Sequence, residues 1–170
     1  MQRFTIRQAI PEDAEGIALV GYLAWRWAYS SFLPADFIEQ RCNMDRRISV
    51  TKLLLAKPDL TIVAVDVDGH VIGFACEHLT PDLGGFDAEI GGLYVAPDAA
   101  RMGVGRALVR EMVHVFQSRG LKSMAIHTLS QNEIGCRFYE KIGGRRHSDA
   151  TWHGYRSLWF AWDDLDRVTA

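Results

Sequence analysis

Hydrophobic residues recur along the chain with two periods, and the changes between them separate predicted strands from predicted helices. Residues 4–9 alternate and predict a strand, whereas residues 11–29 begin with Pro and acidic residues and continue at helical spacing. This helix is apolar on two faces, so we expect it to pack between the sheet and a helix, a subunit or a substrate. The two faces carry Ala18, Tyr22, Trp25, Tyr29 and Phe32 on one side, and Val20, Leu23 and Trp27 on the other.

The next part of the chain predicts two helices followed by a hairpin. Residues 33–57 have a helical pattern that breaks near Asn43. Residues 60–79 contain two β-rich runs on either side of Asp68-Gly69, a pair typical of a tight hairpin turn.

The second half alternates between strands and helices. A strand–helix–strand crossover places its two strands parallel, with a right-handed connection, so residues 89–95 and 123–129 should be parallel neighbours. We therefore expect an α/β fold, with a mixed and mostly antiparallel sheet flanked by helices, in one domain spanning residues 1–170. The remaining predicted elements are strands 88–96, 122–130, 145–151 and 155–162, and helices 103–119 and 131–142.

Composition narrows the class of protein. Hydrophobic residues make up 48% and charged residues 24%, as in a soluble globular protein, and the net charge of -2 argues against a nucleic-acid binder. No apolar run reaches membrane-spanning length and no signal peptide is apparent, so we expect no membrane association. Cys42, Cys76 and Cys136 are too few and too dispersed for a disulfide framework, which favours the cytoplasm.

Two further patterns indicate ordinary surface chemistry. The six histidines are scattered, without a metal-ligand spacing, and we predict no metal site. The pairs Arg46-Arg47 and Arg145-Arg146 are short, and we interpret each as part of a solvated face.

The segment RMGVGR, residues 101–106, lies where a predicted strand gives way to a helix. The first turn of a helix presents backbone N–H groups without intrahelical partners, and these can bind an anion. Leu108 stands where a dinucleotide-binding motif requires its third glycine, and no G-K-[ST] follows for a P-loop. By itself the segment fits either a plain turn or a phosphate cradle.

The flanking sequence resolves this choice. Residues 89–112, EIGGLYVAPDAARMGVGRALVREM, and residues 132–144, NEIGCRFYEKIGG, resemble the GNAT superfamily of acyl-CoA-dependent N-acetyltransferases. The resemblance includes a strand ending in V-x-P, a glycine pair opening a helix, a later Asn, and an FYEK-like segment before a glycine. Residues 6–34 are also similar to the first strand and helices of many members. Two positions depart from the family pattern: Ala100 replaces a usual Gln or Arg, and Gly144 replaces a frequent Phe.

The resemblance implies acetyl-CoA as co-substrate and an amine as acceptor, with the cofactor bound where two parallel strands splay apart. The acceptor class, whether small-molecule amine, amino acid, antibiotic or peptide amine, is not specified. The implied contacts are Leu93, Tyr94 and Val95 on the pantetheine arm, and the N–H groups of Arg101, Met102, Gly103, Val104, Gly105 and Arg106 on the pyrophosphate.

The resemblance also implies catalytic roles. Asn132 matches an Asn that contacts pantetheine, although a plain helix cap explains it equally well. Tyr139 matches a tyrosine that protonates the leaving thiolate, the alternative being a core aromatic. Glu89 is the leading candidate for the base, with Glu77, His78 or a water chain as alternatives.

Two broader alternatives stay open from the sequence. The chain is expected to be an N-acetyltransferase acting on a primary amine, and the alternative is a catalytically weak CoA-binding regulatory or interaction module. Exposed aromatic faces on the first helix or on the LWFAW segment, residues 158–162, would suit a homodimer.

Overall fold

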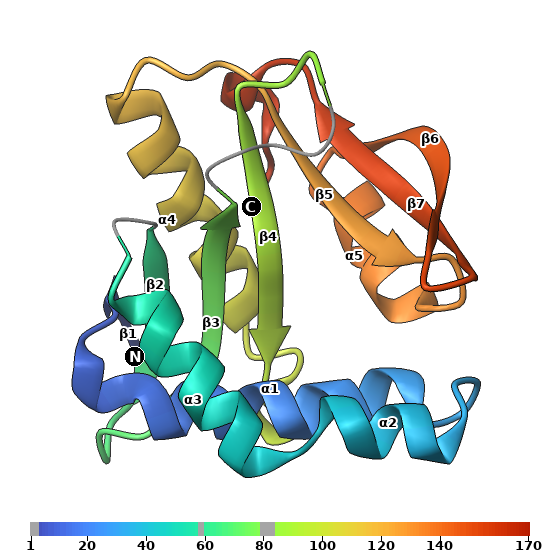
Figure 1. Ribbon diagram of the computed structural model, residues 1–170. Helices are drawn as coiled ribbons and strands as arrows, with labels where there is room; N and C mark the ends of the chain where they lie inside the picture. The colour runs from blue at the N-terminus through green and yellow to red at the C-terminus, as the bar shows by residue number, and fades with distance from the viewer. Residues whose placement is uncertain (1–3, 58–59, 79–83) are drawn as a thin grey trace. The chain divides into compact units, whose positions relative to one another are not determined.

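The computed structural model describes residues 4–57, 60–78 and 84–170, which form two compact units (Figure 1). The first contains the described residues up to Cys76 together with Leu93–Leu108, and the second contains Glu77–Gly92 and Val109–Ala170. Strands β3 (Val71–His78) and β4 (Ala88–Val95) and helix α4 (Val104–Ser118) contribute residues to both units. The expectation of a single domain stays a prediction.

The seven strands are hydrogen-bonded in the order β1-β2-β3-β4-β5-β7-β6. Strands β4 and β5 run parallel, whereas β1 with β2, β2 with β3, β5 with β7 and β6 with β7 are antiparallel. The predicted α/β fold, with a mostly antiparallel sheet and one parallel pair, is confirmed.

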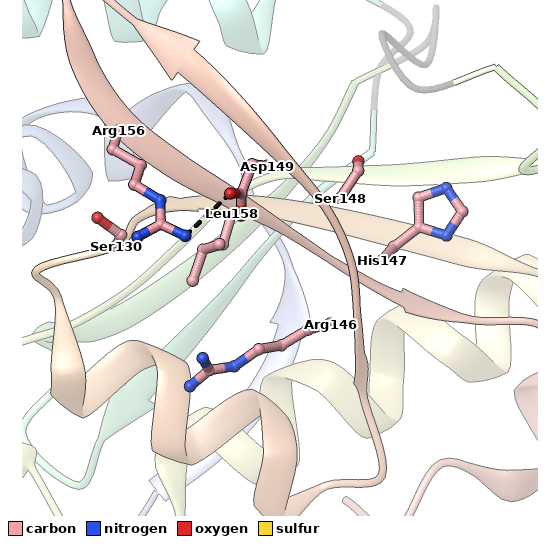
Figure 2. Close-up of a pocket in the computed structure, with 7 residues that line it drawn as sticks. All are labelled: Ser130, Arg146, His147, Ser148, Asp149, Arg156 and Leu158. Atoms are coloured by element: carbon pink, nitrogen blue, oxygen red, sulfur yellow. Dashed lines mark hydrogen bonds and ion pairs between the residues drawn. The ribbon is translucent and has the colours of Figure 1, made fainter.

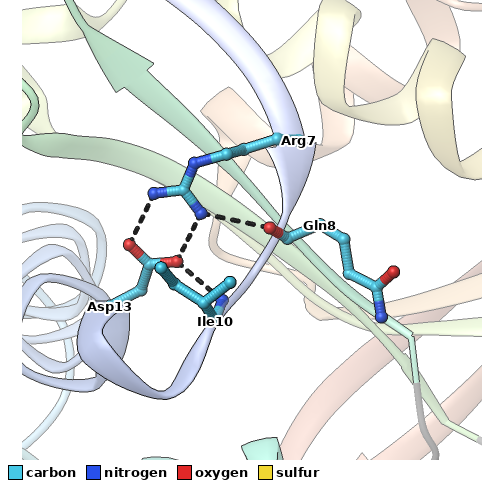
Figure 3. Close-up of polar contacts among 4 residues, drawn as sticks. All are labelled: Arg7, Gln8, Ile10 and Asp13. Carbon is cyan, nitrogen blue, oxygen red and sulfur yellow. Dashed lines mark hydrogen bonds and ion pairs between the residues drawn. The ribbon is translucent and has the colours of Figure 1, made fainter.

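An ion pair between Arg7 and Asp13 links the N-terminal strand to the turn before the first helix (Figure 3). Strand β1 (Phe4–Gln8) carries Arg7, and a short 3-10 turn, η1 (Pro11–Asp13), presents the largely buried Asp13. The Asp13 carboxylate accepts hydrogen bonds from Arg7 Nη1 at 2.6 Å, Arg7 Nη2 at 2.8 Å and the Ile10 N–H at 2.8 Å. These hydrogen bonds, that of Arg7 first, lower the pKa of Asp13.

Helix α1 (Ala14–Tyr29) and helix α3 (Met44–Leu55) pack together in the first unit. Trp25 and Tyr29 are buried, as expected for the first apolar face. On the opposite face, Leu23 is 38% exposed and Trp27 is 49% exposed in the described chain, so a subunit or a substrate stays the predicted partner of this side. Val20 on that side is buried, because it contributes to a core cluster with Val63 and Phe74.

The helix break predicted near Asn43 is confirmed. Helix α2 (Ala35–Arg41) ends just before this residue. The Asn43 side chain then accepts a hydrogen bond from the Arg46 N–H at 2.9 Å and caps α3. An Asn at this position satisfies an N–H that the helix itself cannot pair.

The predicted hairpin is also confirmed, with β2 (Thr61–Asp66) and β3 antiparallel; Leu79, the last residue of the predicted segment, lies outside the described residues. Gly69 has φ of 89°, a value that favours glycine. The turn is closed by a hydrogen bond from the Gly69 N–H to the Asp66 carbonyl at 3.2 Å.

The second unit contains β5 (Met124–Leu129), α5 (Glu133–Lys141), β6 (Arg145–Trp152), β7 (Tyr155–Trp162) and the short turn η3 (Leu165–Arg167). The parallel ladder pairs Ala88–Ile90 with Met124–Ile126, although both strands continue beyond it. Residues Leu158–Trp162 are buried, so the suggestion that the LWFAW segment is an exposed dimer face is wrong. Their side chains belong to the core of this unit instead.

The structure explains the unusual Gly144. A Cβ atom at this position would lie 2.6 Å from Trp162 Cζ2 and 2.9 Å from the Tyr139 carbonyl oxygen. Trp162 is buried and its Nε1 donates to the Ile142 carbonyl at 3.1 Å. The indole therefore occupies the space that a larger residue at position 144 would need. Among the described helices, none is long and apolar enough to cross a membrane.

Candidate active site

The RMGVGR segment forms an open turn leading into α4. Arg101 has φ of 66° and Gly103 has φ of 85°, two left-handed residues within three positions. The helix starts at Val104, and its first intrahelical hydrogen bond runs from the Ala107 N–H to the Gly103 carbonyl at 3.0 Å. The N–H groups of the first turn therefore precede the helical hydrogen-bond ladder, where the helix dipole favours an anion.

Space is available above this turn. No heavy atom lies within 4 Å of a Cβ built on Gly103, and Arg101, Met102 and Gly103 are all exposed. A left-handed conformation at Arg101 costs roughly 1 kcal/mol or more, and such backbone strain is concentrated at functional sites. The geometry is compatible with a phosphate group, but it does not by itself distinguish a cradle from a plain turn, since the turn at Gly69 is equally open.

Ala100 lies just before this turn, in extended backbone with φ of -61° and ψ of 144°. Its methyl group offers no hydrogen bond to an anion. The cationic side chain nearest in sequence is the exposed Arg101, so any side-chain charge in the cradle comes one residue later than in the usual family pattern.

Leu93, Tyr94 and Val95, at the end of β4, belong to the same unit as the cradle and are half-buried. The Tyr94 ring packs on Phe74, with ring centroids 5.2 Å apart, and its hydroxyl accepts a hydrogen bond from Trp25 Nε1 at 3.2 Å. Burial raises the pKa of the Tyr94 phenol, so the group stays protonated at neutral pH.

In the second unit, Glu89 lies beside His78. The Glu89 side chain is only 6% exposed, and its Oε1 atom lies 3.4 Å from Nδ1 of His78, whose side chain is 46% exposed. A Cβ on Gly91 would come within 3.1 Å of the His78 Cβ, so this glycine allows the close approach of β3 at His78. The pair links a buried carboxylate to a solvent-accessible imidazole.

Glu77 has a different environment. Its buried carboxylate accepts two hydrogen bonds from Nη1 of Arg119, at 2.8 and 3.1 Å. Both carboxylate oxygens of Glu77 are therefore already engaged by the Arg119 guanidinium. Of the three candidate bases, the structure brings Glu89 and His78 together and gives Glu77 a partner of its own.

Asn132 caps α5, as one of its two interpretations predicted. Its Oδ1 accepts a hydrogen bond from the Gly135 N–H at 3.1 Å, and its Nδ2 donates to Thr128 Oγ1 at 3.1 Å. An amide nitrogen has two hydrogens, so the cap leaves donor capacity on Nδ2.

Tyr139 is buried in an aromatic cluster on α5. Its ring lies 5.4 Å from Phe160, 5.6 Å from Phe138 and 6.5 Å from Trp162, measured between centroids. The core interpretation is therefore confirmed for the ring. The role of the hydroxyl as a proton donor stays a prediction.

A separate pocket of about 460 Å³ opens on the β6–β7 side of the second unit (Figure 2). None of the predicted site residues lines it. Within it, Arg156 donates to Asp149 at 2.9 Å, and Arg146 is paired outside it with Glu140 at 2.8 Å. The lining residues are Ser130, Arg146, His147, Ser148, Asp149, Arg156 and Leu158.

The turn between β2 and β3 also gathers possible ligand atoms. Side-chain atoms of Asp66, Asp68 and His70 lie within 4.8 Å of one another. The Asp66 carboxylate already accepts hydrogen bonds from the N–H groups of Asp68 and His70, at 3.0 and 2.8 Å. Turn geometry accounts for this grouping.

Sequence patterns do not identify one candidate functional residue, Arg47. Arg47 was interpreted as part of a solvated face, but its Nε atom is buried in the structure. By contrast, Arg145 and Arg146 are exposed, as expected, and pair with Asp163 and Glu140. No local signal distinguishes the two arginine pairs, because the difference arises from where α3 meets α1.

Comparison with known proteins identifies the class of protein that this fold and cradle define. A family model described as the acetyltransferase (GNAT) family matches residues 20–144. The chain belongs to this family, and it is an N-acetyltransferase that uses acetyl-CoA as co-substrate.

Individual relatives agree with this assignment. The chain is 29% identical over 129 residues to the uncharacterized N-acetyltransferase YuaI of Bacillus subtilis, covering 75% of this chain and 73% of the relative. It is 22% identical over 142 residues to the spermidine N(1)-acetyltransferase of Thermoplasma acidophilum, covering 81% and 86%. Its fold is similar to that of the PaiA N-acetyltransferase of T. acidophilum, solved in complex with coenzyme A, with a TM-score of 0.76, 23% identity and coverage of 92% and 97%.

Proposed function

We propose that this enzyme acetylates a primary amine by direct attack on acetyl-CoA, with the N-terminus of α4 holding the pyrophosphate. The carrying observation is the turn before α4, where Arg101 and Gly103 are left-handed and the space above Gly103 is open. In this proposal the N–H groups of residues 101–106 bind the phosphate oxygens, and the arginine at position 101 adds charge.

The strand end before this turn would hold the rest of the cofactor arm. Leu93, Tyr94 and Val95 are adjacent to the cradle in sequence and share its unit. An extended backbone can pair with the amides of pantetheine as it would with another strand. An N–H of this strand would also donate to the oxyanion that forms on the acetyl oxygen.

The reaction needs a neutral amine. The amine nitrogen attacks the acetyl carbonyl carbon, the C–S bond breaks, the amine loses a proton, and the thiolate of CoA gains one. An alkyl ammonium with pKa near ~10.4 is deprotonated at pH 7 at a cost of roughly 4 to 5 kcal/mol. A general base, acting directly or through water, reduces this barrier.

Glu89 is proposed as that base, in contact with His78. The 3.4 Å approach between the two side chains supports a relay, in which the proton accepted inside moves to the half-exposed imidazole. Glu77 is assigned a structural role through Arg119. These steps use side chains, backbone and water alone.

Tyr139 is proposed to protonate the leaving thiolate through its hydroxyl, while its ring stays packed on Phe160. Asn132 would use the remaining hydrogen on Nδ2 for pantetheine while its oxygen caps α5. Both proposals are compatible with the structural roles that these side chains already have.

We also propose a cellular compartment and an oligomeric state for the enzyme. Cys42, Cys76 and Cys136 all lie in the described part of the chain and form no disulfide there, which fits a reducing compartment such as the cytoplasm. The exposed Leu23 and Trp27 on α1 would suit a homodimer contact.

Two measurements test the proposed function. Calorimetry should give a dissociation constant for acetyl-CoA in the micromolar range or tighter, and no binding at millimolar cofactor would refute the cradle. A thiol-release screen over amines, amino acids, peptides and aminoglycosides should then show acceptor-dependent turnover. Binding without turnover on any acceptor would instead favour a catalytically weak CoA-binding module.

A further inference from the structure

A half-buried cation lies next to the proposed pantetheine strand. The guanidinium of Arg47, on α3, packs against Gly21 of α1, where a Cβ atom would come within 2.6 Å of Nη1. Its Cζ atom lies 6.0 Å from the centroid of the Trp25 ring. Glycine at position 21 thus leaves room for the guanidinium to enter between the two helices.

This cation is not neutralised inside the protein. Its Nε atom is buried without a hydrogen-bond partner, and no carboxylate among residues 4–57, 60–78 and 84–170 forms an ion pair with it. Leaving a buried polar atom without a partner is costly, so such atoms are usually paired or serve a ligand. Helix packing alone does not require a cation here.

A second hydrogen-bond donor, the Tyr94 hydroxyl, is linked to Arg47 through Trp25. Trp25 links Arg47 to Tyr94, because the indole lies near the guanidinium and donates its Nε1 hydrogen to the Tyr94 oxygen at 3.2 Å. The phenol proton of Tyr94 is then left to donate. Arg41, the last residue of α2, has its Cζ atom 5.6 Å from the centroid of the Phe37 ring, and burial lowers its pKa.

We infer that Arg47, with the Tyr94 hydroxyl, binds an anionic group of the acceptor, so that the substrates are amines that also carry a carboxylate or phosphate. This inference rests on the proposed function, because it places the anion beside residues 93–95, where the acetyl-bearing arm would lie. An acceptor of the amino-acid type has its amine and anion only a few bonds apart, which matches this proximity. A polycation would be repelled by Arg47.

The test compares amines that differ only in the anionic group. Lysine with cadaverine, ornithine with putrescine, and phenylalanine with phenethylamine are matched pairs, assayed by thiol release from acetyl-CoA. Wild-type kcat/KM should favour the carboxylate member by about ten- to a hundredfold, the scale of one or two charge-assisted hydrogen bonds. Arg47→Gln should bring that ratio close to one, and Arg47→Lys should restore part of it.

The control is Arg26→Gln, which makes the same change in net charge at an exposed position of α1. It should leave the ratio unchanged. Equal losses on both members of each pair with Arg47→Gln, or a wild-type preference for the amines lacking the anion, would overturn the inference.

The anion could instead be a phosphate of the cofactor, and a second arm separates these sources. Calorimetry should give the same acetyl-CoA affinity for wild type and Arg47→Gln. A loss of cofactor affinity with unchanged acceptor ratios would overturn the inference while leaving the proposed function intact.

If no amine is acetylated, the proposed function fails. The proposed anion site at Arg47 can still be tested by measuring whether carboxylates bind. The melting temperature with lysine, ornithine or phenylalanine should then rise for wild type and not for Arg47→Gln, which would support an anion site. No shift with any carboxylate in wild type would overturn it. Arg47→Gln should leave the melting temperature without ligand nearly unchanged, since Arg47 is half-buried and its buried Nε atom has no hydrogen-bond partner to lose.

Discussion

The Nδ1 atom of His78 lies 3.4 Å from the Oε1 atom of Glu89, and the two side chains differ sharply in exposure, at 46% and 6%. They come from β3 and β4, neighbours in the sheet. A buried carboxylate next to a half-exposed imidazole can accept a proton inside the protein and pass it outward. This relationship is why Glu89 is preferred to Glu77 as the base.

Glu89→Gln should lower kcat by about 10²- to 10⁴-fold, the usual contribution of a general base, with little change in the dissociation constant of acetyl-CoA. Steady-state thiol release and calorimetry measure the two quantities. Glu77→Gln is the matched comparison, since it alters another buried carboxylate. It should lower the melting temperature, because it leaves Arg119 without its charged partner, and should preserve kcat. The opposite pattern, with kcat lost only in Glu77→Gln, would assign the base to Glu77.

Tyr139→Phe should lower kcat and leave both the melting temperature and the acetyl-CoA affinity nearly unchanged. Phenylalanine retains the ring contacts with Phe160 and Trp162, so the variant removes only the hydroxyl. Tyr155→Phe, a half-buried tyrosine on β7, serves as the control and should keep wild-type turnover. Wild-type kcat in Tyr139→Phe would show that this residue acts only in the core.

Gly103→Ala should weaken acetyl-CoA binding by about tenfold or more, since a left-handed alanine costs roughly 1 to 2 kcal/mol and its methyl group projects into the proposed phosphate space. Gly69→Ala carries a similar strain, because Gly69 has φ of 89° and equally open surroundings. Both variants should lose comparable stability by thermal melting, but only the first should lose cofactor affinity. Equal cofactor affinities in calorimetry would mean that the turn does not bind the pyrophosphate.

Asp13→Asn should destabilise the protein by about 1.5 to 3 kcal/mol, the range for hydrogen bonds to a charged group. The pH dependence follows from the lowered pKa of Asp13, whose first cause is the hydrogen bond from Arg7. The folded protein holds this carboxylate deprotonated below the unfolded pKa of about 3.9. The stabilisation is therefore complete above that pH and is lost as the pH falls through the folded value.

Urea unfolding of wild type and Asp13→Asn from pH 7 to pH 2 measures this effect. The difference in unfolding free energy between them should be constant at neutral pH and shrink in acid. A difference that does not depend on pH would show that the Asp13 charge contributes nothing to stability.

Much of the fold could be predicted because local patterns and tertiary contacts agree. Asn43 both interrupts the helical pattern and caps α3, and Gly69 both interrupts the β pattern and adopts the conformation that its turn requires. Exposure was harder to predict. The outward side of α1 and the LWFAW strand are similarly apolar in sequence, yet Trp27 is exposed and Trp159 is buried. What covers an apolar face is decided by distant parts of the chain.

In the candidate site too, features formed by neighbouring residues could be predicted, whereas features formed by distant residues could not. The glycine turn and the start of α4 could be predicted because they are contiguous in sequence, and their role as a phosphate cradle stays a prediction. Arg47 could not, because its burial depends on Gly21, which is 26 positions away by sequence numbering and lies on another helix. Gly144 departs from the family pattern because Trp162, 18 positions later in the chain, occupies the space beside it, and no local sequence feature shows this.

The most direct test of the acetyltransferase account compares the thiol released from acetyl-CoA with the N-acetylated amine formed, by colorimetry and mass spectrometry on the same wild-type reactions. If the enzyme transfers acetyl groups to amines, thiol release should depend on the amine, with one acetylated amine for each free thiol. Thiol release that is independent of every amine, or that leaves all the amines unmodified, would contradict it.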